Sequence, residues 1–422
     1  MTGQSTTPGD TKYLRKALAL AEGGRGRVSP NPLVGAVVVR GGEVIGEGFH
    51  AELGGLHAER AALADAARRG EDAAGATMYV TLEPCAHQGR QPPCVDAMIE
   101  ANLARVVIAS DDPTAKAAGK GPEQLRAAGV EVDFLGRAGA GDAEGRGDAA
   151  GIASDVTGVA SEACLLNQPF RKHGRTGLPW VLWKTAMSLD GRTTTPEGAS
   201  PWISGERSRE LVHVWRGECD AIAVGIGTVL ADDPLLTARL GEARQPVRVV
   251  FDSGARLPLD SQLLATLDEA PVTVVHHPDA DPHRVEALLR AGAETIAAGA
   301  PASAPTATAA GATPTASPGP GTDSAERIYT ALAELGRRGL TSLLLEGGAT
   351  LAAAFAEADQ IDEARVFVAP LILGGPVHLP ELTASGRESS APQPLPTRLQ
   401  GSPGVSETVG EDTLIRTRFK EW

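Results

Sequence analysis

Four residues in three separate segments limit what this chain can fold into. They are His57 and Glu59, then Cys85, then Cys94, with a proline directly before each cysteine. An imidazole and two thiolates are ligands that Zn²⁺ prefers, and three protein ligands leave a fourth position for water, as catalytic zinc sites require. A fold that uses all four residues must bring the three segments together at one point.

The chemistry that such a set supports is the activation of water. Zinc lowers the pKa of a bound water strongly, and a glutamate beside it can take the proton and deliver it to a leaving amine. The pattern His-x-Glu followed by Pro-Cys-x-x-Cys is typical of zinc deaminases. Here eight residues separate Cys85 from Cys94 instead of two.

The sequence predicts regular elements around these residues. Residues 57–70 are rich in alanine and end in glycine, which favours a helix with His57 in its first turn. Residues 77–82 favour a strand that leads to Cys85, and a proline opens a helix that carries Cys94. Because a helix N-terminus lowers the pKa of a thiol, these positions suit zinc binding.

Other interpretations of the same residues stay open. A lone cysteine is usually a small buried apolar residue, and two cysteines could form a disulfide. A structural zinc site is closed by four protein ligands, and His87 could supply the fourth. Glu59 favours the catalytic interpretation, because a structural site would not need it.

Longer stretches of the first 120 residues resemble one enzyme family. Residues 81–94 read Thr-Leu-Glu-Pro-Cys-Ala-His-Gln-Gly-Arg-Gln-Pro-Pro-Cys, and residues 30–35 read Pro-Asn-Pro-Leu-Val-Gly. Both are similar to signatures of the RibD family of bifunctional riboflavin-biosynthesis deaminase/reductases. The resemblance implies zinc on the histidine and the two cysteines, with Glu59 as the proton shuttle. The chain departs from the family pattern at residues 112–115, which read Asp-Pro-Thr-Ala where Asp-Pro-Asn-Pro is usual.

The 422 residues suffice for two α/β domains. Strands that alternate with helices predict a three-layer α/β domain at residues 11–136, cytidine-deaminase-like by the resemblance. Residues 137–160 include a run of Gly, Ala and Asp and predict a linker. Residues 161–422 form the second domain, with a disordered insertion rich in Ala, Pro, Thr and Gly near residues 297–321.

Apolar runs that end in glycine predict a mostly parallel central sheet in the second domain. They lie at residues 180–184, 220–228, 247–253, 272–275 and 342–350. In such sheets ligands bind at the carboxyl ends of the strands. The pair Gly347-Gly348 before a helix favours an anion-binding turn for a pyrophosphate. Gly225-x-Gly227 is a weak signal, because it lacks the third glycine of the dinucleotide fingerprint.

The second domain resembles the reductase half of the same family, whose fold is similar to dihydrofolate reductase. The matching runs are residues 188–192, 202–204, 228–234 and 345–348. The resemblance implies NADPH contacts at Ala186, Trp202, Thr228, Asp232, Ser253, Gly348, Ala349, Thr350, Leu351, Ala352, Ala353 and Ala354. It implies substrate contacts at Ser200, Arg216, Leu236, Arg239 and Glu346.

Three arginines of this domain suit phosphate groups. Arg216 and Arg239 have the chemistry to clamp a 5′-phosphate, although either is equally compatible with a solvated surface position. Ser253 with Arg256 is a hypothesis for selection of the 2′-phosphate of the cofactor. The reduction needs no nucleophilic side chain, and the sequence names no proton donor for it.

Composition excludes some classes of partner. The net charge of −14, from 39 basic and 53 acidic residues, argues against a general nucleic-acid binder, as does the aromatic content of 4%. No apolar run reaches membrane-spanning length, and residues 1–10 are too polar for a secretory signal. Cys164 and Cys219 are best read as packed or free thiols. We expect a cytoplasmic homo-oligomer.

These observations lead to one main functional hypothesis and two alternatives. The main hypothesis is zinc-dependent hydrolytic deamination of 2,5-diamino-6-(5-phospho-ribosylamino)pyrimidin-4-one, followed by NADPH-dependent reduction of the ribosyl to the ribityl chain. One alternative is a deaminase of nucleic acids or free bases. The other is a zinc-stabilised binding module with an inactive reductase half.

Overall fold

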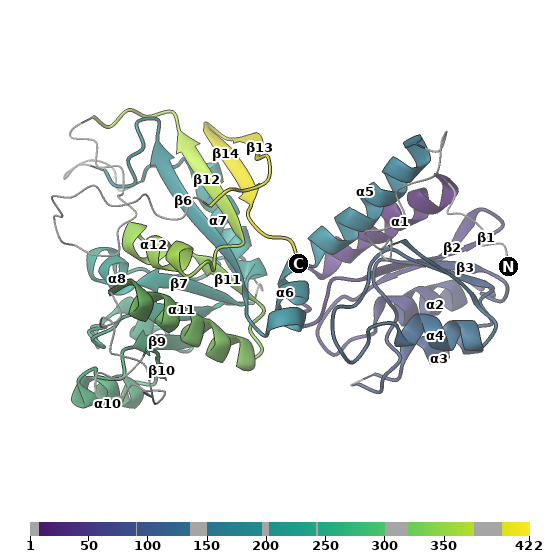
Figure 1. Cartoon of the computed structure of the whole chain (residues 1–422), viewed down its shortest axis with the longest axis horizontal. Helices are drawn as coiled ribbons and strands as arrows, with labels where there is room; N and C mark the ends of the chain where they lie inside the picture. Colours follow the sequence, from purple (N-terminus) through teal and green to yellow (C-terminus); the bar gives the residue numbers. More distant parts are fainter. Residues whose placement is uncertain are drawn as a thin grey trace, which may run out of the picture. The chain divides into compact units, whose positions relative to one another are not determined.

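A computed structural model describes residues 8–89, 91–135, 150–195, 202–241, 244–299, 320–374 and 399–422. The chain divides into two compact units (Figure 1). The first unit comprises Met1–Thr176 together with Trp422, and the second comprises Gly177–Glu421. No helix among the described residues is both long and apolar enough to span a membrane.

The first unit contains the helices and strands that the sequence predicts between residues 13 and 132, and two further helices after them. Its elements are α1 (Pro8–Ala21), η1 (Glu22–Gly24), β1 (Gly35–Arg40), β2 (Glu43–Phe49), α2 (Ala58–Arg68), β3 (Thr77–Val80), α3 (Cys94–Glu100), β4 (Arg105–Ile108), α4 (Lys120–Ala127), β5 (Glu131–Phe134), α5 (Ala150–Leu166) and α6 (Gln168–Thr176).

The five strands form one sheet in the order β2-β1-β3-β4-β5, and helices cover both of its faces (Figure 1). Alternate residues of each strand point to opposite faces. In β1, Ala36 and Val38 pack with α2, α3 and α4, whereas Val37 and Val39 pack with α1 and α5. Two apolar cores therefore lie on the two sides of the sheet, and the predicted three-layer α/β domain is confirmed.

The division between the units falls later in the chain than the sequence suggested. We expected the second domain to begin at residue 161, but α5 and α6 belong to the first unit. Val159 and Ala163 of α5 are fully buried against α1 and the sheet. Most of the Gly-, Ala- and Asp-rich run that suggested a linker lies outside the described residues, and residues 150–160 of the expected linker belong to α5.

The second unit alternates strands and helices and ends in a hairpin. Its elements are β6 (Trp180–Ser188), α7 (Glu206–Glu218), β7 (Ala221–Gly225), α8 (Ile226–Asp232), β8 (Val247–Phe251), α9 (Gln262–Ala265), β9 (Val272–His276), α10 (Pro282–Arg290), β10 (Glu294–Ala297), α11 (Pro320–Arg337), β11 (Ser342–Leu345), α12 (Ala349–Glu357), β12 (Glu363–Ala369), β13 (Val405–Val409) and β14 (Asp412–Arg418). Most of the predicted insertion lies outside the described residues.

These strands form a nine-stranded sheet in the order β10-β9-β8-β7-β11-β6-β12-β14-β13. Neighbours from β10 through β12 are parallel, and only β12-β14 and β14-β13 pair antiparallel. The mostly parallel sheet predicted from the apolar runs is therefore confirmed. The strands β10, β12, β13 and β14 were not predicted.

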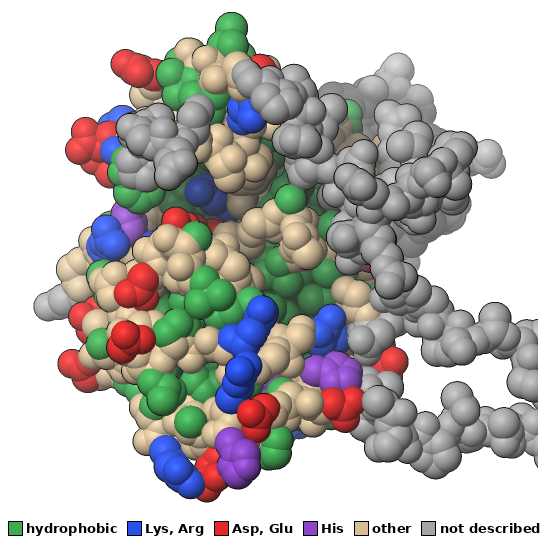
Figure 2. Space-filling model, turned by 90° about the vertical axis from the view of Figure 1, so that its left-hand side faces the viewer, with side chains coloured by type: hydrophobic (Ala, Val, Ile, Leu, Met, Phe, Trp, Pro, Cys, Tyr) green, Lys and Arg blue, Asp and Glu red, His purple; other side chains and the backbone are tan. Residues whose placement is uncertain are grey.

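Helices cover both faces of this sheet as well. Val181 and Leu343 pack with α11 and α12 on one face. On the other face, Trp215 of α7 stacks on Phe367 of β12, with ring centroids 5.5 Å apart. β7 leads directly into α8, which lies on the left of Figure 1, so the carboxyl ends of the parallel strands lie on that side. Figure 2 shows the molecule from this side and therefore looks onto the carboxyl edge of the sheet. This face shows a hollow lined by hydrophobic side chains, with basic side chains beside it.

Candidate functional site

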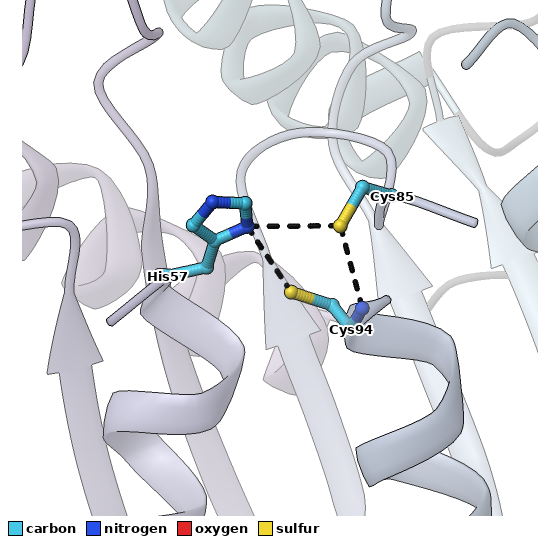
Figure 3. Close-up of side chains that lie close together, drawn as sticks. All are labelled: His57, Cys85 and Cys94. Atoms are coloured by element: carbon cyan, nitrogen blue, oxygen red, sulfur yellow. Dashed lines mark hydrogen bonds between the residues drawn. The ribbon is translucent and has the colours of Figure 1, made fainter. Parts of the chain in front are cut away.

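The three predicted zinc ligands meet in the first unit. Nδ1 of His57 lies 3.6 Å from Sγ of Cys85 and 3.4 Å from Sγ of Cys94 (Figure 3). The three ligand atoms all lie within 4.8 Å of one another. His57 comes from the start of α2, Cys85 from the loop after β3, and Cys94 from the start of α3.

Two helix N-termini hold these side chains. His57 is the N-cap residue of α2, and Cys94 is the first residue of α3. The backbone N–H of Cys94 donates to Sγ of Cys85 over 3.3 Å. The side-chain hydrogen bond from Cys94, helped by His57 and this backbone N–H, lowers the pKa of Cys85 below its ordinary value. Arg60 of α2 donates to the carbonyl of Pro93 over 2.8 Å, which ties the two helix starts together.

Glu59 lies on the first turn of α2, two residues after His57. Its side chain is buried, with 4% of its surface exposed. Burial raises the pKa of the Glu59 carboxyl, and the charge of Cys85 raises it further. A carboxyl with a raised pKa beside a water-activating site is suited to accept and return a proton.

Two residues beside this cluster were not among the predicted site residues. Nδ2 of Asn31 lies 3.1 Å from Nε2 of His50, and Nδ1 of His50 lies 2.9 Å from the carbonyl of Leu56. The His50 ring meets the His57 ring edge to face, with centroids 5.4 Å apart. Burial lowers the pKa of His50, so the neutral ring is favoured. Asn31 was part of a recognised signature, but nothing in the sequence pointed to His50.

In the second unit, the predicted contacts gather along one edge of the sheet. The strands β8, β7, β11 and β6 are adjacent and parallel, so their carboxyl ends meet there. Predicted residues follow or end each of these strands: Ser253 after β8, Thr228 after β7, Glu346 and Gly348 after β11, and Ala186 near the end of β6. Trp202 is exposed before α7, and Arg209 stacks over its ring at 5.1 Å.

The start of α12 is an open helix N-terminus at this edge. Gly348 is the N-cap residue, and because it has no side chain it makes no capping hydrogen bond. The residues from Gly348 to Thr350 are exposed. A Cβ atom at Gly347 would lie 2.8 Å from the end of the Leu351 side chain, so a larger residue there would have to displace that side chain. Ala352, Ala353 and Ala354 are buried. Their side chains therefore pack inside the unit, and the NADPH contacts expected for residues 348–354 remain a prediction.

A buried ion pair lies next to this turn. The guanidinium of Arg216 pairs with both carboxylate oxygens of Glu346, at 2.8 Å and 2.9 Å, and Arg216 also reaches the carbonyl of Thr237 at 3.3 Å. Burial alone would raise the pKa of Glu346, but Arg216 holds it below its ordinary value. Burial lowers the pKa of Lys184 on β6, against the charge of Glu346. Arg216 therefore pairs with a carboxylate in this structure, and its contact with a substrate phosphate remains a prediction.

Leu236 and Arg239 lie in a strained loop after α8. Their φ angles are 55° and 54°, and Asp233 in the same loop has φ 39°. Left-handed backbone is costly for such residues and concentrates at binding and catalytic sites. Leu236 is buried, whereas Arg239 is exposed. Asp232, at the end of α8, is exposed as well, and Ser200 lies outside the described residues.

Two family models match this chain. Residues 8–110 match the model described as the cytidine and deoxycytidylate deaminase zinc-binding region, and residues 179–400 match the RibD C-terminal domain. The chain is 37% identical to the riboflavin biosynthesis protein RibD of Actinobacillus pleuropneumoniae, covering 96% of this chain and 94% of that one. The chain belongs to the RibD family.

Other members of the RibD family agree with this assignment. The RibD of Escherichia coli is 36% identical over 86% of this chain and 89% of its own. The solved structure of Acinetobacter baumannii RibD has a TM-score of 0.73 and 32% identity, and covers 97% of this chain and 98% of that one. A diaminohydroxyphosphoribosylaminopyrimidine deaminase/5-amino-6-(5-phosphoribosylamino)uracil reductase of Thermotoga maritima has a solved structure with the same TM-score and coverage, and 31% identity.

The geometry of the RibD-family cluster fits zinc. Bonds of about 2.3 Å to sulfur and 2.0–2.1 Å to nitrogen place the two kinds of ligand about 3.6 Å apart in a tetrahedron. The observed separations of 3.4 Å and 3.6 Å match this value. In the described part of the chain, the ligand group contains His57, Cys85 and Cys94, and His87 is not part of it. A site closed by His87 as a fourth ligand therefore finds no support.

Lys184 is the main residue of the RibD-family reductase half that sequence reasoning missed. It lies in the apolar strand β6, where a single basic residue gives little signal. Its electrostatic neighbours Glu346 and Arg216 come from distant parts of the sequence. The pairing of β6 with β11 brings Lys184 near Glu346, and the ion pair with Glu346 brings Arg216 of α7 to the same place.

Proposed function

We propose that this RibD-family chain is a bifunctional enzyme that carries out two consecutive steps of riboflavin biosynthesis. The first unit removes an amine from a diaminopyrimidinone ribosyl phosphate by hydrolysis, and the second reduces its ribosyl group to a ribityl chain. The observation that carries the first step is the cluster of one imidazole and two thiols with the buried Glu59 beside it. The second rests on the open start of α12 beside Lys184 and Glu346.

In the deaminase step, the chain supplies the ligands and moves the proton. His57, Cys85 and Cys94 hold the zinc, which when bound supplies the Lewis acidity that activates water. The carboxyl of Glu59, with its raised pKa, accepts a proton from the water and returns it to the departing amine nitrogen. His50 and Asn31 border the cluster and suit contact with the polar edge of the pyrimidine ring.

In the reductase step, the chain binds and orients the reactants and delivers a proton. NADPH, when bound, supplies the hydride. The backbone N–H groups of the exposed residues Gly348 to Thr350 suit its pyrophosphate, as helix N-termini bind anions. Lys184, with its lowered pKa, is placed to protonate the ring oxygen of the ribose as it opens, and Arg216 holds Glu346 in place to accept hydrogen bonds from the sugar hydroxyls.

The remaining site assignments belong to the same proposal. Ala186, Trp202, Thr228, Asp232 and Ser253 contact NADPH, and Ser200, Leu236 and Arg239 contact the substrate. The exposed Arg239 is better placed for the 5′-phosphate than the paired Arg216. We place the reaction in the cytoplasm, where the two proposed zinc-ligand thiols of Cys85 and Cys94 would stay reduced. We expect a homo-oligomer without nucleic-acid or membrane partners.

The direct test supplies the diaminopyrimidinone ribosyl phosphate to the zinc-loaded protein and follows the products by mass. Without NADPH, we expect only the deaminated product. With NADPH, we expect that product to gain two hydrogens, with NADPH consumed in a one-to-one ratio. Conversion of single-stranded oligonucleotides or free bases in place of this substrate would contradict the proposal, as would an unchanged substrate.

A further inference from the structure

The turn after β8 separates a buried acid from an exposed hydroxyl. Asp252 has no exposed surface, and it accepts hydrogen bonds from the backbone N–H groups of Arg256 and Leu257, the latter over 2.9 Å. Ser253, the next residue, is exposed at the carboxyl edge of the sheet. The two side chains at the end of this strand therefore have different roles.

This arrangement bears on which nicotinamide cofactor the edge selects. In dinucleotide-binding sheets, an acid near this position hydrogen-bonds the ribose 2′-hydroxyl and favours NADH, whereas an arginine accommodates a 2′-phosphate and favours NADPH. The carboxylate oxygens of Asp252 are occupied inside the turn. The carboxylate of Asp252 is therefore unable to accept a hydrogen bond from a ribose hydroxyl of the cofactor.

Arg256, the arginine that the sequence suggested for the 2′-phosphate, is partly committed to this acid. Its Nε lies 3.2 Å from Oδ1 of Asp252. A fully buried carboxylate needs a cationic or hydrogen-bonding partner. The side chain of Arg256 also folds back over Gly254, where a Cβ atom would lie 3.4 Å from its Cδ. The guanidinium of Arg256 is thus engaged within the turn through its Nε atom.

A second arginine reaches the same turn from a distant element. Nη1 of Arg327 on α11 donates to Oγ of Ser253. The backbone carbonyl of Ser253 accepts a hydrogen bond from N–H of His277 over 3.0 Å, which fixes the turn against the end of β9. The acceptor that the structure gives Arg327 is a neutral hydroxyl, so its positive charge is not cancelled there. A guanidinium and a hydroxyl on one exposed turn form a site for a phosphate dianion.

We propose that Arg327, with the hydroxyl of Ser253, binds the 2′-phosphate of NADPH and is the main determinant of NADPH over NADH. Arg256 serves chiefly to hold Asp252 and the turn. This inference rests on the proposed reductase function, and it assigns a residue of α11 to cofactor selection.

Binding of nucleotides to the full-length protein tests the proposal without requiring turnover. Calorimetry would measure the affinities of NADPH, NADH, 2′,5′-ADP and 5′-AMP for the wild type, Arg327→Ala, Arg327→Lys, Arg256→Ala and Arg290→Ala. Arg290 is an exposed arginine that pairs with Glu286 on α10, so it controls for loss of a positive charge. Thermal unfolding of each variant reports whether the fold is kept.

The expected result is that Arg327→Ala weakens NADPH and 2′,5′-ADP about tenfold or more, since a hydrogen bond to a charged group is lost. NADH and 5′-AMP should be unaffected, Arg327→Lys should recover part of the loss, and Arg290→Ala should match the wild type. An Arg327→Ala protein that keeps its preference for NADPH overturns the proposal, as does loss of preference confined to Arg256→Ala. If the wild type binds neither dinucleotide, the reductase function itself fails.

Discussion

Glu59 is the residue on which the proposed deamination depends most. Glu59→Gln keeps the size of the side chain but removes its ability to carry a proton. We expect the variant to retain zinc and to lose deaminase turnover by about 10²–10⁴-fold, the usual contribution of a positioned acid–base group. Zinc content by atomic absorption and the rate of ammonia release check the two halves of this prediction.

The matched comparison is Cys94→Ser, which removes a ligand thiolate in the same cluster. That variant should lose zinc and ammonia release together. Normal turnover in Glu59→Gln would refute the proton-shuttle role of Glu59.

Lys184 leads to a prediction on pH dependence. Burial lowers its pKa below the ordinary 10.5, and only the protonated amine can donate. The reductase rate should therefore be highest at pH values below the lowered pKa of Lys184, where the amine is protonated, and should fall as the pH rises through that pKa. The measurement is the pH profile of NADPH oxidation with deaminated substrate supplied. In Lys184→Met we expect a large loss of rate at every pH, with deamination unchanged; a wild-type profile in that variant would contradict the role.

At the scale of elements, α7 depends on a residue from the far end of the chain. Asp412, the first residue of β14, is buried and accepts from N–H of Gly205 over 2.8 Å and from the hydroxyl of Ser208 over 2.5 Å. Asp412 therefore caps the N-terminus of α7, which carries Arg216. Asp412→Ala should lower the free energy of unfolding by about 1–2 kcal/mol.

Denaturant unfolding measures that change, and the Michaelis constant for the reductase substrate should rise because Arg216 loses its rigid support. Asp260→Ala, at an exposed position, is the control and should leave both values near those of the wild type. Equal stability of Asp412→Ala and wild type would show that the cap is unimportant.

Helices and strands with a clear apolar periodicity were predictable from the sequence. Elements whose structure depends on contacts with distant parts of the chain were not. The helix that carries Glu59 and the buried strands such as β7 have clear apolar periods. The hairpin β13-β14 lies at the edge of the sheet and carries polar residues on one face, so its sequence pattern only weakly indicates strands. Its pairing with β12 shows that it belongs to the sheet. Helix α5 was not predicted, because the linker was expected to extend to residue 160; the contact of α5 with α1 shows that this helix belongs to the first unit.

For the whole molecule, the two functions were easier to predict from the sequence than the details of either site. The zinc ligands follow from residue types and spacing, because few arrangements of these groups serve another purpose. The reductase contacts came from resemblance, and the structure adds relations among residues at this edge: Arg216 pairs with Glu346, Glu346 acts electrostatically on Lys184, and Arg327 donates to Ser253. These relations are between residues far apart in the chain, which spacing alone cannot reveal.

The central claim is that one chain holds two separate active sites, one in each unit. Removal of zinc with a chelator tests it most directly, with ammonia release and NADPH oxidation measured on the same sample. We predict that deamination stops and returns when zinc is added back, while reduction of separately supplied deaminated substrate continues at its original rate. Loss of both activities on chelation, or deamination that persists without zinc, would contradict the account.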